Sequence, residues 1–169
     1  MQETKTGRKT ILSTTNFLHC GDDYLFIHRT KKGSSVDFGR LNGIGGKVEA
    51  GETFLACAIR ETIEETGYQV SERNCQLRAV VNLSGGYQQD WIICFFVIEV
   101  DSTSIPLGLV NPEGELLWIP ANQVLSAGYE LVDDLHYLWN DIVEYSGTIF
   151  FAAQLDEHEK ITQHSIFHL

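Results

Sequence analysis

Residues 46–68 read Gly46-Lys-Val-Glu-Ala-Gly-Glu-Thr-Phe-Leu-Ala-Cys-Ala-Ile-Arg-Glu-Thr-Ile-Glu-Glu-Thr-Gly-Tyr68. This stretch predicts a helix over residues 53–66, followed by Gly67, a residue type common just after the last helical turn. Each helical residue advances about 100° around the axis, so Glu61, Glu64 and Glu65 fall on one edge. The neighbouring arc is narrow, mostly apolar and expected to dock on a sheet; its members are Leu55, Ala58, Ile59, Thr62 and Thr66.

The three glutamates on one helix edge predict a metal site. Like charges at this spacing repel one another, at a cost of a few tenths of a kcal/mol per pair. A bound divalent cation would remove that cost. Hard oxygen ligands suit Mg²⁺, with Mn²⁺ as an alternative, because these ions bind through few carboxylates and keep positions for substrate phosphates. The competing interpretation is an acidic helix face in contact with solvent.

The spacing of the glycine and polar residues favours the metal site. Gly46 is followed after five residues by Glu52, and after seven more by the run Arg60-Glu-x-x-Glu-Glu-x-Gly67. This pattern resembles the signature of the Nudix hydrolases at all its glycine and polar positions, while Thr62 and Tyr68 replace aliphatic residues. The resemblance implies an enzyme that cleaves nucleoside diphosphates linked to another moiety. It also implies the Nudix fold, a single α/β domain built as an α/β/α sandwich with a mixed β-sheet.

The resemblance further implies roles for residues of this signature, residues 46–67, which is called the Nudix box. The Gly45 carbonyl, Glu61, Glu64 and Glu65 are expected to hold the metal, which polarises the phosphates and activates a water molecule. Glu52 and Arg60 are implied to be structural partners that fix the loop against the helix. A guanidinium can hold a carboxylate through two hydrogen bonds, which lysine cannot reproduce.

One more carboxylate is expected on the loop before a later strand. The run 112–118, Pro-Glu-Gly-Glu-Leu-Leu-Trp, lies where Nudix enzymes often place a further metal ligand or general base. Glu113 is the favoured residue, and Glu115 competes with it. The alternative is an ordinary solvated loop glutamate. The proton acceptor for the attacking water stays open among Glu61, Glu65 and Glu113.

The flank of the box suggests a substrate. Residues 42–48, Asn-Gly-Ile-Gly-Gly-Lys-Val, are similar to the MutT-like branch that includes the 8-oxo-dGTP diphosphatases, which hydrolyse oxidised purine nucleoside triphosphates. In that branch the asparagine binds the purine edge, which corresponds to Asn42 here. Gly46 and Lys47 are also expected to contact the substrate. The alternative for Asn42 is a turn residue.

A second segment points to the same branch. The run Leu131-Val-Asp-Asp134 resembles the segment that carries a pair of base-reading aspartates, here Asp133 and Asp134. Adjacent carboxylates can share a proton and so present one donor and one acceptor to a base. The branch has a base-stacking tryptophan where this chain has Leu131. The alternative is that both aspartates cap the N-terminus of a helix.

Charge argues against a long nucleic acid as the partner. The net charge is −11, and eleven of the twelve Lys and Arg residues lie at or before Arg78. Beyond that point thirteen acidic residues face Lys160 alone. Since nucleic-acid binding depends on neutralising phosphates with Lys and Arg, a small nucleotide is the expected partner. Arg29, Lys31 and Lys32 are candidates to reach its phosphates.

The remaining pattern predicts one domain over residues 10–169 after a polar lead-in, residues 1–9. Helices are expected at 133–145 and, shorter, from Pro120, with Leu135, Leu138, Ile142 and Tyr145 as the buried stripe of the longer one. Residues 31–40 read as a loop. The expected strands are 10–20, 24–28, 76–83, 91–100, 115–119, 148–154 and 161–167. Trp91, Phe95 and Phe96 are expected in the core, although inward-facing members of their strand could line a base pocket.

The cysteine pattern and the absence of targeting signals predict a cytoplasmic protein. The four cysteines show no C-x-x-C spacing, no signal peptide is recognisable, and no apolar run approaches the ~20 residues that span a bilayer. None of the six histidines shows metal-ligand spacing. Two alternatives to a triphosphate pyrophosphohydrolase stay open: a Nudix hydrolase of ADP-ribose or another nucleoside diphosphate derivative, and a Nudix domain that only binds a regulatory nucleotide. The oligomeric state is unknown.

Overall fold

The computed structural model describes residues 7–31, 37–86 and 89–169, which form one nine-stranded mixed sheet. The strand order is β7-β3-β2-β1-β5-β4-β8-β9, and β6 pairs with β2 beside this path. The strands are β1 (Lys9–Cys20), β2 (Asp23–His28), β3 (Arg40–Asn42), β4 (Cys75–Gly85), β5 (Gln89–Glu99), β6 (Glu115–Pro120), β7 (Glu130–Leu131), β8 (Ile149–Leu155) and β9 (Ile161–His168).

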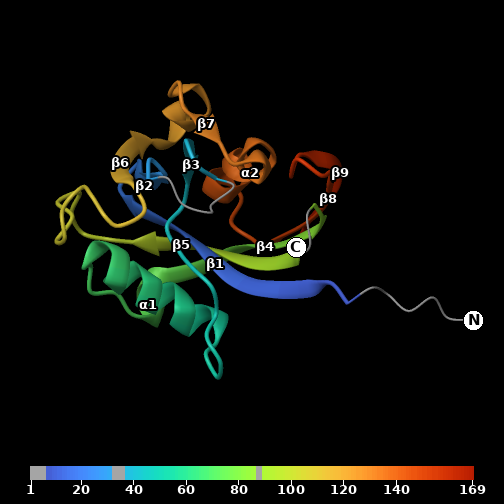
Figure 1. The fold of residues 1–169 in the computed structure, drawn as a ribbon. Helices are drawn as coiled ribbons and strands as arrows, with labels where there is room; N and C mark the ends of the chain where they lie inside the picture. The colour runs from blue at the N-terminus through green and yellow to red at the C-terminus, as the bar shows by residue number, and fades with distance from the viewer. Residues whose placement is uncertain (1–6, 32–36, 87–88) are drawn as a thin grey trace, which may run out of the picture.

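Two α-helices cover opposite faces of this sheet, α1 (Phe54–Thr66) and α2 (Asp133–Glu144) (Figure 1). Of two short 3₁₀ helices, η1 (Glu72–Asn74) lies between α1 and β4, and η2 (Ala121–Ser126) lies between β6 and β7. The sheet is mixed because β1 runs parallel to β5 and antiparallel to β2. The predicted α/β/α sandwich with a mixed sheet is therefore confirmed.

Side chains of the central strand β1 pack into the core on both faces of the sheet. Successive side chains of a strand point to opposite faces, so Phe17 packs on the α2 side and Leu18 on the α1 side. Both side chains are fully buried. The same alternation places Phe95 on the α2 side and Phe96 on the α1 side, as expected for core residues.

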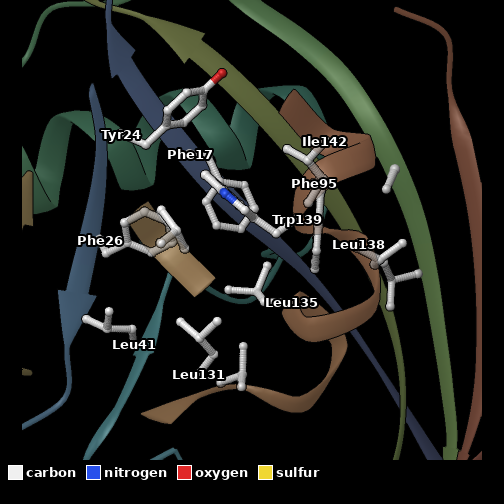
Figure 2. Packing of buried hydrophobic residues seen from close by; sticks show 14 of the residues in the cluster. Phe17, Tyr24, Phe26, Leu41, Phe95, Leu131, Leu135, Leu138, Trp139 and Ile142 are labelled. Carbon is white, nitrogen blue, oxygen red and sulfur yellow. The ribbon is translucent and has the colours of Figure 1, made fainter. Parts of the chain in front are cut away.

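An aromatic cluster around Trp139 fills the α2 face (Figure 2). The ring centroids of Phe17 and Phe26 lie 5.6 and 5.1 Å from that of Trp139, in edge-on and tilted geometries that favour aromatic pairs. The indole Nε1 donates to the Ala121 carbonyl oxygen at 2.9 Å, which satisfies the one polar atom of this side chain. The cluster fixes α2 over the sheet and, with it, the residues that begin the helix.

The predicted apolar stripe of α2 is largely confirmed. Leu135, Leu138 and Ile142 are fully buried. Tyr145, the fourth predicted member, follows the helix as its C-cap, and it packs against the same cluster while partly exposed.

The α1 face differs from its prediction. Asn16 of β1 donates from Nδ2 to the Ala58 carbonyl oxygen at 3.0 Å and to Thr62 Oγ1 at 3.3 Å. The buried residues of α1 are Cys57, Ala58, Thr62 and Thr66, and Leu55 packs half-buried against the core cluster on this side. The predicted stripe was wrong at Ile59, which is half-buried and does not belong to that cluster. Small side chains let the helix lie close to β1, so the larger apolar residues flank the contact.

Two short strands lay outside the predicted pattern. β3 has three residues and β7 has two, and they pair in parallel through Arg40–Glu130 and Leu41–Leu131. Segments this short carry no periodicity to detect. Residues 37–40 of the predicted loop belong to the described part, while Lys32 lies outside it.

The four cysteines are free, as expected: Cys20, Cys57, Cys75 and Cys94. Among the described residues, no helix combines the length and apolar character that crossing a membrane requires.

Candidate active site

The glycine loop of the box lies along β1 as an irregular antiparallel partner. The Asn16 N–H donates to the Ile44 carbonyl at 2.6 Å, and the Thr14 N–H donates to the Gly46 carbonyl at 2.9 Å. Gly45 has φ +142°, and a Cβ there would collide with the Thr14 carbonyl. Glycine is required at this position because the loop backbone lies against the strand in a conformation that L residues rarely adopt.

α1 begins and ends with local capping bonds. Thr53 accepts from the Ala56 N–H at 3.1 Å, the preferred contact of an N-cap threonine. Gly67 has φ +79° and donates its N–H to the Ile63 carbonyl at 2.9 Å. The predicted helix boundaries are correct, so the spacing of the box glutamates is set by one uninterrupted helix.

Arg60 connects the loop to the helix. Its Nε and Nη2 donate to Glu52 at 2.8 and 3.0 Å, the paired geometry that the Nudix resemblance implies. Its Nη1 also donates to Glu61 at 2.7 Å and to Glu64 at 3.3 Å. The Arg60 hydrogen bonds lower the pKa of Glu52 to about 2, so this carboxylate stays ionised across the neutral range.

Glu65 lies apart from this network. It accepts from the Gly45 N–H at 3.3 Å and from Asn111 Nδ2 at 3.4 Å. Burial, reinforced by the negative charge of Glu113, raises the pKa of Glu65 to about 8. A positive charge at this place would favour the ionised form instead.

The outlying carboxylate that lies beside the box is Glu113. Asn111 is buried and shapes its loop, because Asn111 Oδ1 accepts from the N–H groups of Glu113 and Gly114 at 2.8 and 3.0 Å. Glu113 pairs with Arg29. Glu115 belongs to β6, where it is exposed and paired in register with His28, so it does not share this position.

The oxygen donors around Gly45 match a hard divalent cation in their chemistry. The charge of Glu113 disfavours the ionised form of Glu65, and Glu61 lies against the α-carbon of Gly46. Arg60 contacts one oxygen of Glu61 and one of Glu64. Within the described residues, no group of three or more acidic, His or Cys side chains has metal-site geometry.

One cleft of about 1160 Å³ joins the box to the predicted base-reading residues. Gly45, Gly46, Lys47, Glu61, Arg29 and Glu113 line it on the side of the box. Asn42, Asp37, Arg40, Asp133 and Asp134 line it on the side of α2. Two segments about 90 residues apart in the chain thus face the same space, as a nucleotide with its base and its phosphates would require.

The beginning of α2 does not match the capping alternative. The N-cap is Val132, whose side chain makes no capping bond, and Asp133 and Asp134 occupy the first helical turn. Neither aspartate is the cap residue, so the capping interpretation is wrong as stated. Their position still places both charges near the positive end of the helix dipole.

The two aspartates have different surroundings. Asp133 Oδ1 accepts from Lys160 Nζ at 3.0 Å, and its Oδ2 accepts from the Ile161 N–H at 3.3 Å. Asp134 is 7% exposed, and its Oδ1 has no hydrogen-bond partner in the described part of the chain. Burial, followed by the nearby charge of Asp37, raises the pKa of Asp134 to about 7.

The cleft also has an apolar wall. Trp91 and Ile93 of β5 line it together with Leu83 and Val132. Lys47 Nζ lies 6.0 Å from the Trp91 ring centroid. Trp91 is thus a wall residue rather than a core residue, whereas Leu131 is buried in the α2-side core. The aromatic surface on which a base could stack is therefore Trp91 of β5, and not the residue at position 131.

Several residues of the site were not predicted from the sequence: Asp37, Asn111, Glu159, Lys160 and Ile161. One signal could have helped. Residues 13–16 of β1, Ser-Thr-Thr-Asn, are four buried polar residues within an apolar strand, and three of them line the cleft. Arg29 and Lys31, proposed for phosphates, instead contact the Glu113 loop, with Lys31 Nζ 2.7 Å from the Asn111 carbonyl.

A family model of the NUDIX domain matches residues 12–139. The chain belongs to the Nudix family. It is accordingly a hydrolase that acts on phosphoric anhydride bonds.

Solved structures share this fold. The mMutator MutT protein from Bacillus halodurans matches with a TM-score of 0.78 and 19% identity, over 92% of this chain and 97% of that one. The MutT protein from Methanosarcina mazei Go1 matches with a TM-score of 0.64 and 18% identity, over 82% and 94%. A bifunctional NMN adenylyltransferase/ADP ribose pyrophosphatase from Francisella tularensis, complexed with AMP and a Mn ion, matches with a TM-score of 0.56 and 16% identity, over 81% of this chain and 43% of that one. At these identities the likeness concerns the fold.

Proposed function

We propose that this Nudix hydrolase is a Mg²⁺-dependent pyrophosphohydrolase that converts oxidised purine nucleoside triphosphates to the monophosphate and pyrophosphate. The observation that carries the proposal is the single cleft shared by the Nudix box and by Asn42, Asp133 and Asp134. A triphosphate can lie at the box while its base reaches α2. The four free cysteines agree with a reducing compartment such as the cytoplasm.

The ion would be held by carboxylates of the box, by Glu113 and by the Gly45 carbonyl. When bound, a divalent ion stabilises the charge of the phosphates and lowers the pKa of a coordinated water. Mn²⁺ has similar ligand preferences and is an alternative. The proposed ligands are Gly45, Glu61, Glu64, Glu65 and Glu113.

The protein itself must position the substrate and accept a proton. Lys47 lines the cleft and would contact the phosphates together with the Gly46 backbone, whereas Arg29 lines the cleft in its pair with Glu113. Glu61 and Glu113 line the cleft, and Glu65 is half-buried beside Glu113. These three carboxylates are the candidates to accept the proton from the attacking water.

The base would be distinguished by hydrogen bonds at the far end of the cleft. Asp133 accepts only, because both its oxygens already face donors. Asp134, with its raised pKa and unpartnered Oδ1, can donate or accept. Asn42 lines the cleft; its Oδ1 accepts from the Gly43 N–H at 2.8 Å, and its side chain hydrogen-bonds the Asp37 carboxyl, so one amide hydrogen is left for a further contact. Such a set suits a purine edge that mixes donors and acceptors.

ADP-ribose or another nucleoside diphosphate derivative is the second candidate. The cleft, at about 1160 Å³, exceeds the usual range for small-ligand pockets, and the stacking tryptophan of the MutT-like branch is absent at Leu131. Both observations would suit a longer ligand held mainly by its diphosphate.

The products separate these candidates. The full chain is incubated with Mg²⁺ and, separately, with 8-oxo-dGTP, dTTP and ADP-ribose, and the released nucleotides, pyrophosphate and phosphate are quantified. Preferred cleavage of 8-oxo-dGTP to the monophosphate and pyrophosphate supports the proposal. Preferred formation of AMP and ribose phosphate from ADP-ribose would replace it with the second candidate. Release of inorganic phosphate alone from the triphosphates would overturn both.

A further inference from the structure

The turn between β8 and β9 forms part of the cleft wall. Asp156 organises this turn, because its Oδ1 accepts from the N–H groups of His158 and Lys160 at 2.8 and 2.9 Å. Glu159 has φ +59°, a left-handed conformation that non-glycine residues adopt rarely and that local bonding must maintain. The turn is therefore a defined structure that presents Glu159 and Ile161 to the cleft.

This turn also contacts the beginning of α2. Lys160 Nζ lies 3.0 Å from Asp133 Oδ1, and the backbone N–H of Ile161 donates to Asp133 Oδ2 at 3.3 Å. Arg40 adds a weaker contact from β3, with its Nη1 3.9 Å from the same Oδ1. Each oxygen of Asp133 thus faces a donor supplied by another element.

The charge around this contact depends on Lys160. It is the only Lys or Arg after Arg78, so no other basic side chain of the C-terminal half can replace it. Glu130 lies 3.9 Å from Lys160 and also pairs with Arg40 at 3.2 Å. Both cations that contact Asp133 therefore also interact with Glu130. Lys160 is 48% exposed at its side chain while Asp133 is 22% exposed, so the contact is partly shielded from solvent.

Asp134 has no ion pair of this kind among the described residues. Its Oδ1 is buried and lacks a hydrogen-bond partner there, while its carboxyl group also hydrogen-bonds the backbone at Leu135 and at its own position. The neighbouring acidic groups, Asp37 and Asp133, act on it only through their charge. Two adjacent aspartates of one helical turn are thus made chemically different by what surrounds them.

We propose that Lys160 is a positioning residue for base selection: it holds Asp133 as an ionised acceptor at the cleft and leaves Asp134 as the partner able to donate to the base. This inference rests on the proposed function, since it concerns how the same cleft distinguishes a purine edge. It assigns a specificity role to the β8–β9 turn, far in sequence from the Nudix box. The chemistry recognised is a base edge that offers a donor to Asp133 and a hydrogen-bond acceptor to Asp134.

The test compares three variants of the full chain. Lys160→Met removes the charge and keeps most of the side-chain length, Lys160→Arg keeps the charge, and Glu157→Gln changes an exposed residue of the same turn that pairs with His158 at 3.6 Å. For each, kcat and KM are measured with Mg²⁺ on 8-oxo-dGTP and on dTTP, and Tm is recorded. Lys160→Met is expected to lower the ratio of kcat/KM for 8-oxo-dGTP over dTTP about tenfold, mostly through KM for the purine. Lys160→Arg should recover most of the ratio, and Glu157→Gln should keep it.

The outcomes separate this inference from the proposed function. An unchanged ratio in Lys160→Met, with the wild type still preferring the purine, would overturn the role of Lys160 and leave the proposed function standing. Equal losses on both nucleotides with a lower Tm, and no recovery in Lys160→Arg, would reduce Lys160 to a structural contact and also overturn the inference. A wild-type enzyme without any preference for 8-oxo-dGTP would overturn the proposed function and this inference with it.

Discussion

At the scale of single residues, the box depends on how Arg60 shares one guanidinium among three glutamates. Glu52 receives the two parallel bonds, while Glu61 and Glu64 each receive one from Nη1. Glu64 is 60% exposed at its side chain, so its contact contributes little to stability. The loop is therefore held mainly through Glu52, and Glu64 can leave Arg60 at little cost, whereas the Glu61 side chain is 15% exposed and lies 2.7 Å from Arg60.

The exposed position of Glu64 predicts that Glu64→Gln affects turnover far more than stability. The change keeps the shape of the side chain and removes the charge of a proposed metal ligand, so turnover at saturating Mg²⁺ should fall at least ~100-fold. The free energy of unfolding, measured in urea, should change by less than about 0.5 kcal/mol, since the lost ion pair is exposed. A variant with nearly normal turnover would remove Glu64 from the metal site.

The aspartates of α2 provide a second residue-scale prediction. Asp133→Asn and Asp134→Ala should each lower kcat/KM for 8-oxo-dGTP by a factor equivalent to about 1–3 kcal/mol, because a polar group of the base is left mispaired or without its partner. Hydrolysis of dTTP should change far less, since phosphate contacts are distant. Asn42→Ala should behave in the same way. Equal losses on both nucleotides, or a change in Tm alone, would exclude purine recognition by these residues.

At the scale of elements, α2 should make stability depend on pH. The pKa of Asp134 is raised in the folded protein to about 7 from an ordinary value of 3.8. Between these values the folded state keeps a proton that the unfolded state has released, so stability should fall as pH rises from about 4 to about 7. The shift of the Asp134 pKa corresponds to a change of at most about 4 kcal/mol in the free energy of unfolding, at about 1.4 kcal/mol for each pKa unit.

Urea unfolding of the wild type and Asp134→Asn between pH 5 and pH 8, with EDTA present, measures this effect. Glu65 contributes a slope of the same sign, because its pKa is also raised, and it is retained in both proteins. The difference between the two curves therefore isolates Asp134. The wild type should lose more stability than the variant over this range. Parallel curves would show that Asp134 ionises normally in the folded protein.

The elements differ in how far the sequence could predict them. Long strands and both helices followed from periodicity and caps, and α1 was predicted to within one residue of its observed limits, since Thr53 and Gly67 are both caps with local bonds. β3 and β7 were missed because strands of three and two residues show no periodicity, and their pairing with each other joins segments about 90 residues apart. The buried face of α1 was partly wrong because Asn16, a polar residue of another strand, determines which helix positions lie close to the sheet.

At the scale of the whole molecule, the two ends of the cleft also differ in how far they could be predicted from the sequence. The box could be predicted because its loop and helix are contiguous, and its contacts, such as Arg60 with Glu52, span only eight residues. The opposite wall combines β3, β5, α2 and the β8–β9 turn, so Glu159 and Ile161 enter the site only through the sheet order. No local pattern marks such residues.

Activity of the whole enzyme should require a divalent ion. Removing metal with excess EDTA should abolish hydrolysis, and Mg²⁺ or Mn²⁺ should restore it. Ca²⁺ should restore it poorly, because it prefers longer bonds and more ligands than Mg²⁺ and would misplace the attacking water. Thermal unfolding should shift upward on adding Mg²⁺ as an independent sign of binding. Full activity after exhaustive chelation would exclude the proposed mechanism.

The central claim is that one cleft hydrolyses a triphosphate at the box while selecting an oxidised purine at α2. Internal competition tests it most directly: wild type and Asp133→Asn are each given equal concentrations of 8-oxo-dGTP, dTTP and ADP-ribose with Mg²⁺, and all products are followed in the same mixture. The wild type should consume 8-oxo-dGTP first, releasing its monophosphate and pyrophosphate, and Asp133→Asn should lose that preference while still cleaving dTTP. Consumption of the three compounds in the same order by both proteins, or earliest consumption of ADP-ribose, would contradict the account.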